Sequence, residues 1–559
     1  MMKLDAIQHI EPSKLTTDPA LRQVITVLLN IIEEQASRIT ELEHKNEELA
    51  SELKRLKTGQ GNLPKAKPKV PDQSLRPKAG KSKKGTKNHK KGPKNKNIPI
   101  DRIVTLDLKD KSQLPADTKF SCWREVIAQN VVFKRDNVKY RVAVYYSPSS
   151  RRTWSAPLPE AYCGEFGAEL QAFLQTLRHV CDVTEGSLHK LMESVGVKIA
   201  SGTINNILLS NSEMMQQEQR QILRAGIAGS PYANVDGTKS FEKGKRLSTQ
   251  IICAAYFSAY YTMPSKSRLD ILNALQGRPE GGLCFVYNEA TAGWLKYFKV
   301  SRKHRKLLEK LFCNMPPFPL DGFIEQLDRH APGLVDSTAF ERIAGSFALG
   351  HYHTQNDFPV VQLLMSDGGK EYGQVAQLAR SLCWLHDERP YRLLNPRLAT
   401  HRKILEGFLG QYWEFYRQLL DFKEHPPDQQ KSQKTLLSEQ FDKIFTQSTA
   451  YFDLNKLVQK TFAKKEQLLQ VLHYPFLPLH NNAAELAVRR KVRKRDISLH
   501  TMSERGTRTQ DAYMTVVHTA VKLGVSACDY IADRVSRRFN MTPLAKLVAQ
   551  AYSPDPIPL

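Results

Sequence analysis

The chain has 559 residues, enough for several domains, and its 41% hydrophobic and 25% charged residues are the composition of an ordinary soluble globular protein. Lysine and arginine outnumber aspartate and glutamate by 82 to 57, which gives a formal net charge of +25. Solubility alone needs no such sign bias, so the charge favours a polyanionic partner, above all nucleic acid.

The cysteines and the apolar runs exclude two other classes of protein. Eight cysteines are scattered without a CxxC pair, which argues against a disulfide framework and favours a reducing cytoplasm. The start of the chain lacks the apolar core of a signal peptide, and the most apolar run, 251–263, is interrupted by Ser and Tyr and too short to span a bilayer. We therefore expect a soluble, cytoplasmic protein with no membrane partner.

Residues 22–57 carry a heptad repeat, which predicts a coiled-coil dimerisation helix within residues 1–60. An asparagine in the a series favours a dimer in fixed register, so we expect a homodimer or higher oligomer. The alternative is a single amphipathic helix packed on its own domain. The assigned a and d positions include Ile25, Leu28, Ile32, Ile39, Leu42, Asn46, Leu49, Leu53 and Leu56.

Residues 61–98 form a basic linker. The stretch 62–97 holds thirteen Lys and Arg against one acid, Asp72, is rich in Pro and Gly, and has almost no large apolar residue. Such a composition predicts a disordered tether that binds phosphate backbones without reading sequence. The run Ala79-Gly-Lys-Ser82 lacks the earlier glycine of a phosphate-binding loop, so no nucleotide site is indicated.

A small β region is expected at 99–160 and a helical region at 161–228. The segment 131–146 has two β-rich runs around a polar turn at Asp136-Asn137, which predicts a hairpin. Leu170, Phe173, Leu174 and Leu177 share one helical face, and Ser201-Gly-Thr-Ile begins a further helix. The pattern is equally compatible with a helix-turn-helix motif that binds DNA and with short helices that only pack against the rest of the protein.

From residue 229 the pattern alternates between strands and helices, which predicts an α/β domain. The segments 232–235, 248–263 and 359–365 read as strands, and 302–312, 321–345, 400–423 and 433–472 read as helices, with a polar break at 424–432. We expect a catalytic domain at 229–500 with helical insertions near 280–355 and 390–470, followed by a helical region at 501–559.

Three carboxylates stand out in this domain. Asp236 and Asp367 each follow a short apolar strand and precede glycine, and Glu485 opens a helix for which Asn481 or Asn482 is the expected N-cap. Two aspartates and a glutamate supply hard oxygen ligands for Mg²⁺ or Mn²⁺. Taken singly, Asp236 and Asp367 are better explained as turn residues, and Glu485 as a first-turn acid that interacts with the helix dipole.

A basic run directly follows Glu485 and strengthens the metal interpretation. These cations could hold phosphates beside the carboxylates, or form a solvated basic face. The residues proposed to contact DNA are Arg489, Arg490, Lys494, Arg495, Arg505 and Arg508.

Four segments together resemble the insertion-sequence-sixty-six family of bacterial DDE transposases. They are Val235-Asp-Gly-Thr238, Ser366-Asp-Gly-Gly-Lys-Glu-Tyr372, Cys383-Trp-Leu-His386 and His480-Asn-Asn-Ala-Ala-Glu485, in the order seen in that family. The likeness also takes in Lys134-Arg-Asp-Asn-Val-Lys-Tyr-Arg-Val and Gly202-Thr-Ile-Asn-Asn, so it covers most of residues 20–540.

The resemblance implies a fold, an activity and a metal site. The fold would be a ribonuclease-H-like α/β core, a mixed sheet flanked by helices, with Asp236, Asp367 and Glu485 as catalytic residues that bind two Mg²⁺ or Mn²⁺ ions. The activity would be DDE-type cleavage of double-stranded DNA at transposon ends and strand transfer into target DNA, in the bacterial cytoplasm at the nucleoid, with accessory proteins possible. The alternatives are a non-catalytic DNA-binding protein derived from a degenerate transposase, and a ribonuclease-H-like nuclease without strand transfer.

The chain departs from the family pattern at three places. Gly237 stands where an acid often follows the first aspartate, and Leu486 stands where an arginine often follows the glutamate. The zinc region of the family lacks its paired cysteines here and keeps only Cys122 and Cys163, so zinc is not expected there. His386 could contact the scissile DNA or be a packed, hydrogen-bonded histidine.

Overall fold

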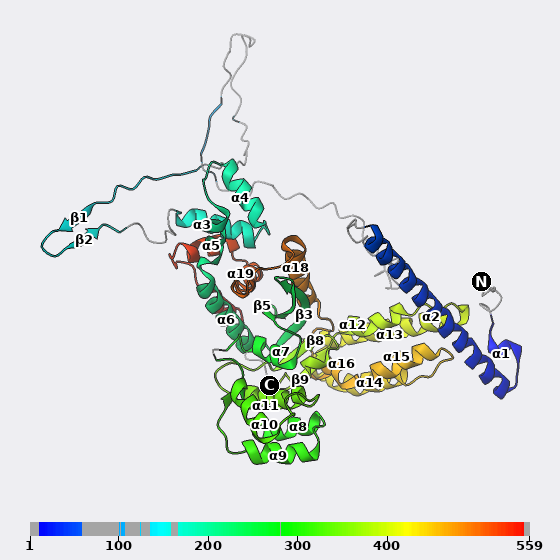
Figure 1. Cartoon of the computed structure of the whole chain (residues 1–559). Helices are drawn as coiled ribbons and strands as arrows, with labels where there is room; N and C mark the ends of the chain where they lie inside the picture. The colour runs from blue at the N-terminus through cyan, green and yellow to red at the C-terminus, as the bar shows by residue number, and fades with distance from the viewer. Residues whose placement is uncertain are drawn as a thin grey trace, which may run out of the picture. The chain divides into compact units, whose positions relative to one another are not determined.

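The computed structural model describes residues 10–58, 100, 102–106, 123, 135–157, 166–279 and 281–552. The predicted basic linker, 61–98, and the two cysteines of the zinc region, Cys122 and Cys163, lie outside these residues. By its internal contacts the chain forms two units, one of residues 1–58 with 140–559 and one of residues 59–139. All the elements described below belong to the first unit (Figure 1).

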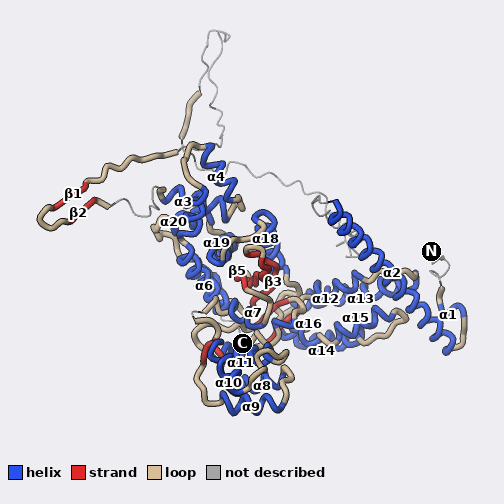
Figure 2. Tube along the Cα trace, in the orientation of Figure 1, coloured by secondary structure: helices blue, strands red, loops and turns tan. Residues whose placement is uncertain are grey.

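A mixed five-stranded sheet forms the centre of this unit, and it confirms the expected α/β class. Its strands lie in the order β5-β4-β3-β8-β9; β3 to β5 are antiparallel neighbours, and β8 and β9 run parallel to β3. The bounds are β3 Tyr232–Glu242, β4 Lys245–Cys253, β5 Ser258–Met263, β8 Leu363–Ser366 and β9 Ala379–Leu382. Figure 2 shows these strands enclosed by helices.

The first strand of the sheet is longer than its sequence suggests. The sequence predicts a strand that ends before Asp236, but β3 continues to Glu242 because it pairs along its whole length with β4. The connecting turn is Lys243-Gly244, and both residues have positive φ, 45° and 81°, as a tight two-residue hairpin turn requires. Asp236 therefore lies inside a paired strand, opposite Ile251.

Helices pack against the sheet, and most of the segment between β5 and β8 is helical. On one side α18 (Asn482–Ser498) packs Ala487 and Val488 against Ile251 and Tyr260 of β4 and β5. The helices between β5 and β8 are α7 (Arg268–Leu275), α8 (Glu289–Tyr297), α9 (Arg302–Phe312), α10 (Leu320–His330) and α11 (Phe340–Thr354). Two short strands, β6 (Cys284–Phe285) and β7 (Phe318–Pro319), lie in the same segment. A 3₁₀ helix, η2 (Lys370–Tyr372), follows β8.

After β9 a second group of helices builds its own apolar core around Trp384. It consists of α12 (Trp384–Leu393), α13 (Ala399–Glu424), α14 (Pro427–Phe445), α15 (Phe452–Phe462), α16 (Lys465–Leu468) and α17 (Gln470–His473). The helical prediction for 400–423 and 433–472 is confirmed, although α14 already begins inside the expected polar break at 424–432. The chain then returns to the sheet through α18.

The remaining elements flank this core. A helical group contains α3 (Ala168–His179), α4 (Glu185–Ser194), α5 (Ser201–Ser210) and α6 (Ser212–Gly229), and the chain ends with α19 (Glu504–Lys522), α20 (Ala527–Val535) and α21 (Leu544–Tyr552). In the described part of the small β region the hairpin is β1 (Val144–Ser147) with β2 (Arg152–Ser155), and residues 135–143 carry no strand. The first β-rich run of the hairpin predicted around Asp136-Asn137, at 131–134, lies outside the described residues. Among the described residues, none of the helices combines the length and apolarity that crossing a membrane requires.

The N-terminal heptad segment is helical, as predicted. A short helix α1 (Pro12–Leu15) precedes α2 (Pro19–Thr58), a single helix of 40 residues. Asn30 and Glu33 of α2 are buried against the beginnings of α15 and α13. The pairing of two such helices into a coiled coil stays a prediction.

Candidate active site

Parallel pairing brings the first two carboxylates to the same level of the sheet. Asn234 of β3 lies opposite Met365 of β8. Asp236 and Asp367 each lie two residues further along these neighbouring strands, and side chains two residues apart on a strand point to the same face. The two carboxylates therefore leave adjacent strands on the same side, where β8 ends.

Local hydrogen bonds fix both carboxylates. The Gly237 N–H donates to Oδ1 of Asp236 at 2.7 Å, and the Gly369 N–H donates to Oδ1 of Asp367 at 3.1 Å. A glycine one residue after Asp236 and two residues after Asp367 thus donates its N–H to the carboxylate, and the bond at Asp367 forms an Asx turn.

The electrostatics of this pair fit a cation. Burial raises the pKa of Asp236, the nearby Asp367 carboxylate raises it further, and the Gly237 N–H, His386 and Lys266 lower it. Two half-buried carboxylates that repel each other are stabilised by a divalent ion, and carboxylate oxygens are the ligands that Mg²⁺ prefers.

Glu485 joins the pair through His386. Glu485 lies in the first turn of α18, and its Oε1 is 3.7 Å from Nδ1 of His386, which lies in the first turn of α12. The side chain of Cys383 raises the pKa of His386, burial opposes this, and the carboxylates of Glu485 and Asp367 add to the increase. His386 thus lies close enough to all three predicted carboxylates to interact with each of them.

The beginning of α18 is anchored by Asn481. This residue occupies the expected N-cap position, but its side chain does not cap the helix. Its Nδ2 donates instead to the carbonyl of Val235 at 2.8 Å, and its N–H donates to Sγ of Cys383 at 3.3 Å. Asn481 is fully buried, so it ties the helix of Glu485 to the strand of Asp236.

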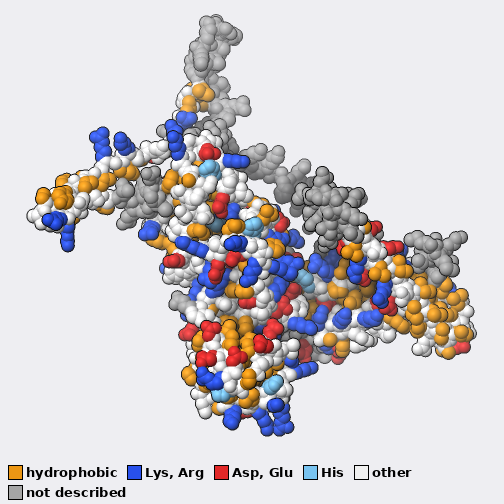
Figure 3. Space-filling view, viewed as in Figure 1, with side chains coloured by type: hydrophobic (Ala, Val, Ile, Leu, Met, Phe, Trp, Pro, Cys, Tyr) orange, Lys and Arg blue, Asp and Glu red, His pale blue; other side chains and the backbone are white. Residues whose placement is uncertain are grey.

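Four of the six predicted DNA contacts are exposed. Arg489 and Arg490 are on α18, and Arg505 and Arg508 are on α19. Arg505 donates to the carbonyl of Leu209 at 3.2 Å, and Arg508 pairs with Glu504. Figure 3 shows Lys and Arg side chains gathered on the face that carries α18.

The other two predicted DNA contacts, Lys494 and Arg495, bind partners within the protein. The ammonium of Lys494 is buried, 3.0 Å from a carboxylate oxygen of Asp182 and bonded to the carbonyl of Arg178. Burial lowers the pKa of Lys494 to about 8, and the Arg178 charge lowers it as well. Arg495 is half-buried and donates to the carbonyl of Lys239 at 3.0 Å.

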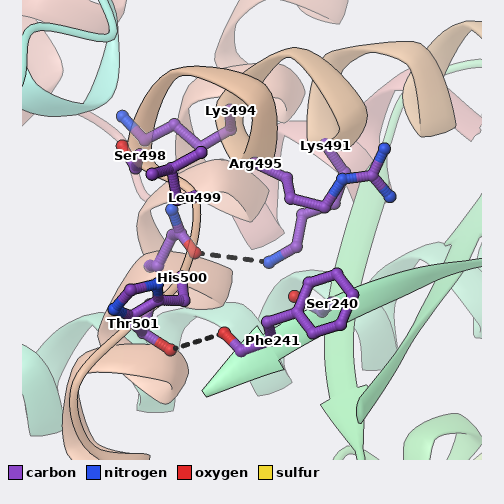
Figure 4. A pocket seen from close by; sticks show the side chains of 10 residues that line it. Ser240, Phe241, Lys491, Lys494, Arg495, Ser498, Leu499, His500 and Thr501 are labelled. Carbon is purple, nitrogen blue, oxygen red and sulfur yellow. Dashed lines mark hydrogen bonds between the residues drawn. The ribbon is translucent and has the colours of Figure 1, made fainter. Parts of the chain in front are cut away.

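A small hollow lies further along α18, where it meets the end of β3. Its volume is about 10 Å³, room for roughly one water molecule, so it holds no nucleotide or base. Figure 4 shows its lining residues, with Thr501 bonded to Phe241; the Thr501 N–H donates to that carbonyl at 3.1 Å. The first α18 residue that lines the hollow, Lys491, lies six residues after Glu485, about 9 Å along the helix axis.

Two basic residues near the aspartates, Lys266 and Arg380, could not be predicted as part of the site from the sequence. Lys266 follows β5, and its Nζ lies 3.4 Å from the carbonyl of Gly237. Arg380 of β9 donates to the carbonyl of Asp367 at 2.5 Å and to Oγ of Ser366 at 2.7 Å. Both come close to the aspartates only through strand pairing, which no local motif announces.

Carboxylates that meet at the end of parallel strands, with a basic helix beside them, form the kind of site that metal-dependent nucleic-acid enzymes use. Residues 350–509 match the model of the transposase IS66 family, a range that contains Asp367, His386 and Glu485. The uncharacterized protein y4jO of Sinorhizobium fredii (strain NBRC 101917 / NGR234) is 32% identical over 336 residues, which are 59% of this chain and 99% of that protein. No solved structure matches the chain. The chain belongs to the IS66 family of transposases.

Proposed function

We propose that this protein is a DDE transposase that cleaves DNA at transposon ends and joins the freed 3′-hydroxyl to target DNA. The observation that carries the proposal is the meeting of Asp236, Asp367 and Glu485 around His386, from two parallel strands and a helix far apart in the chain. The family supports a transposase, and the geometry supplies the carboxylates that such chemistry needs.

The strand arrangement supports a ribonuclease-H-like core. Three antiparallel strands are followed by two that run parallel to the first, and the first and fourth carry Asp236 and Asp367. In such a core the two aspartates come from adjacent strands and the third carboxylate from a later helix. The order of elements here follows that plan.

The residues fit a pair of Mg²⁺ or Mn²⁺ ions held by Asp236, Asp367 and Glu485. Such ions would activate the attacking oxygen, water in cleavage and the 3′-hydroxyl in joining, and would stabilise the leaving oxygen. The chain itself orients the carboxylates through the Gly237 and Gly369 N–H groups and holds α18 in place through Asn481.

Four predicted cations have exposed side chains and would contact the phosphates of double-stranded DNA: Arg489 and Arg490 on the helix of Glu485, and Arg505 and Arg508 on α19, the next helix along the chain. Arg495 would contact a phosphate from the edge of the same surface. A contact from Lys494 would require its ammonium to leave Asp182 and the carbonyl of Arg178.

A strand-transfer assay with Mn²⁺ tests the proposal, with DNA fragments that end in the inverted repeats flanking the reading frame. We expect joined products with the wild-type chain. Asp236→Asn, Asp367→Asn and Glu485→Gln should each lower the rate by about a thousandfold or more, because the metal contribution is worth several kcal/mol. Asp328→Asn, which changes an exposed acid on α10, is the control and should leave the rate unchanged.

Each other outcome points to a different protein. Joining that survives Glu485→Gln would contradict the carboxylate assignment. Cleavage without joining would indicate a ribonuclease-H-like nuclease, and binding without cleavage would indicate a DNA-binding protein derived from a transposase.

A further inference from the structure

The candidate site has a second set of metal-binding atoms, two of which, on Cys383 and His386, the proposed transposase chemistry does not use. Sγ of Cys383, a ring nitrogen of His386 and a carboxylate oxygen of Glu485 all lie within 4.8 Å of one another. Cys383 is buried at the end of β9, while His386 and Glu485 are 26% and 29% exposed. A cation could therefore enter from the histidine and glutamate side and reach the sulfur.

Local structure explains why these three groups meet. Cys383 directly precedes α12 and His386 lies three residues later, a spacing that places both on one face of the first helical turn. Asn481 donates its N–H to Cys383 and, through its side chain, holds α18 against β3. The same residue thus orients the sulfur and positions Glu485 four residues further along the chain.

The donor chemistry separates the site into two halves. Asp236 and Asp367 offer only oxygen, the choice of hard ions such as Mg²⁺. Cys383 and His386 offer sulfur and nitrogen, which select borderline-soft ions such as Zn²⁺ or Co²⁺. In tetrahedral zinc sites the ligand atoms lie roughly 3.3–3.8 Å apart, because the metal–ligand bonds are about 2.0–2.3 Å long. Movements of the side-chain atoms by about 1 Å would therefore bring the three ligand atoms to the spacing of such a site.

We propose that Cys383, His386 and Glu485 form a binding site for a borderline-soft divalent cation such as Zn²⁺, with one coordination position left to solvent. The thiol gives up its proton on binding, so one proton is released to solvent for each ion bound. Because Glu485 is also one of the three carboxylates proposed to hold the catalytic ions, such an ion withdraws it from Asp236 and Asp367. That consequence rests on the proposed function; the binding itself does not.

Co²⁺ titration of the full-length chain, without DNA, tests the site. We expect one Co²⁺ per chain with the near-ultraviolet absorption of a cobalt–thiolate bond, and displacement of that absorption by Zn²⁺. Cys383→Ser should abolish the band, and His386→Asn should weaken Co²⁺ binding at least tenfold, as expected when a ligand is lost. The variant Cys122→Ser/Cys163→Ser, which removes the two cysteines of the family's zinc region, is the matched control and should keep the band.

The proposal is overturned by a wild-type chain without a thiolate band, or by a band that persists in Cys383→Ser. Because Cys383 is buried, its serine variant is first checked by thermal unfolding; His386→Asn changes a partly exposed side chain and gives a second, independent result. The binding assay contains no DNA, so a failure of strand transfer leaves its result standing. Equally, an absence of Co²⁺ binding leaves the oxygen-only half and the transposase proposal untouched.

Discussion

At the scale of single residues, Asn481 does more for the candidate site than its position in the chain suggests. It has no exposed surface, its side-chain amide donates to the Val235 carbonyl, and its backbone N–H donates to Cys383. These bonds join the strand of Asp236, the turn before α12 and the beginning of α18. Its neighbour Asn482 is exposed and has the same side chain.

We expect Asn481→Ala to lower both stability and strand transfer. Loss of the buried amide leaves the Val235 carbonyl without that donor, which costs about 1–3 kcal/mol. The matched control Asn482→Ala should change either quantity by no more than about 0.5 kcal/mol, the ordinary effect of a surface substitution. Urea unfolding measures the first quantity and the Mn²⁺ assay the second. Equal effects of the two substitutions would contradict the anchoring role of Asn481.

The sequence allowed the three candidate carboxylates to be predicted, but not the side chains that lie next to them in space. Asp236 and Asp367 could be singled out because each lies next to glycine after an apolar strand. His386 and Glu485 lie 99 positions apart in the chain and meet only because the intervening segment folds back, which no local pattern encodes. For the same reason the role of His386 stayed open, and Lys494 was predicted to contact DNA. The residue that Lys494 pairs with, Asp182, lies 312 residues earlier in the chain.

At the scale of elements, α19 closes the free edge of the sheet. The N–H groups of Ser258, Tyr260 and Thr262 on β5 donate to Thr519, Thr515 and Asp511 of α19, at 3.2, 3.1 and 2.6 Å. Two residues of strand advance about 6.6 Å and four residues of helix about 6 Å, so the two spacings match. The helix therefore satisfies backbone donors that would otherwise invite another strand.

Asp511 also links α19 to the helix of Glu485. Its carboxylate lies 3.0 Å from Nζ of Lys491 on α18 and 3.4 Å from Arg278, and both Asp511 and Lys491 are buried. A buried ion pair adds little net stability when intact, but removal of one partner leaves the other charge buried without compensation.

We expect Asp511→Ala to destabilise the protein by about 3–5 kcal/mol, because Lys491 loses its counter-charge and β5 loses an acceptor. The double variant Lys491→Met/Asp511→Ala should recover part of this loss, which a double-mutant cycle by urea unfolding measures. Arg329→Ala, which removes an exposed pair with Glu325, is the control and should cost at most about 1 kcal/mol. Strict additivity of the two substitutions would contradict the coupling.

The sequence predicted helices and strands correctly where the local spacing of apolar residues determines the secondary structure. The helix predicted at 302–312 is α9, with the same bounds, because its apolar residues recur at helical spacing. The strand prediction was too short where pairing decided the length: β3 runs beyond Asp236 because β4 lies beside it. The β1–β2 hairpin turns at residues 148–151.

At the scale of the whole molecule, α2 has two faces with different partners. Asn30 bonds to the backbone of Ala450 and Phe452, both at 2.8 Å, and Glu33 accepts from the Leu398 N–H at 3.1 Å and pairs with His401 at 3.4 Å. Burial raises the pKa of Glu33, but hydrogen bonds from His401 and from the backbone outweigh it, and the net shift is downward. Neither Asn30 nor Glu33 belongs to the heptad seam.

Much of the seam is exposed in the single chain, although Ile25 and Ile32 at its beginning are half-buried. Leu28, Ile39, Leu42 and Leu49 are 52%, 55%, 52% and 58% exposed in the single chain. Large apolar side chains at heptad spacing along one helix are the pattern of a coiled-coil interface. Docking through one face and pairing through the other are therefore compatible, so a dimer would hold two candidate active sites in one assembly.

We expect the wild-type chain to be a dimer and Leu42→Asp/Leu49→Asp to be a monomer. Each buried leucine contributes about 1.5–3 kcal/mol, so the double change should weaken association by roughly 3 kcal/mol or more, over a hundredfold in Kd. Sedimentation equilibrium gives the mass directly. The variant Ser37→Asp/Ser51→Asp adds the same two charges at heptad positions outside the seam and should stay dimeric. A monomeric wild type, or a dimer that survives the leucine changes, would mean that α2 serves only to dock on its own chain.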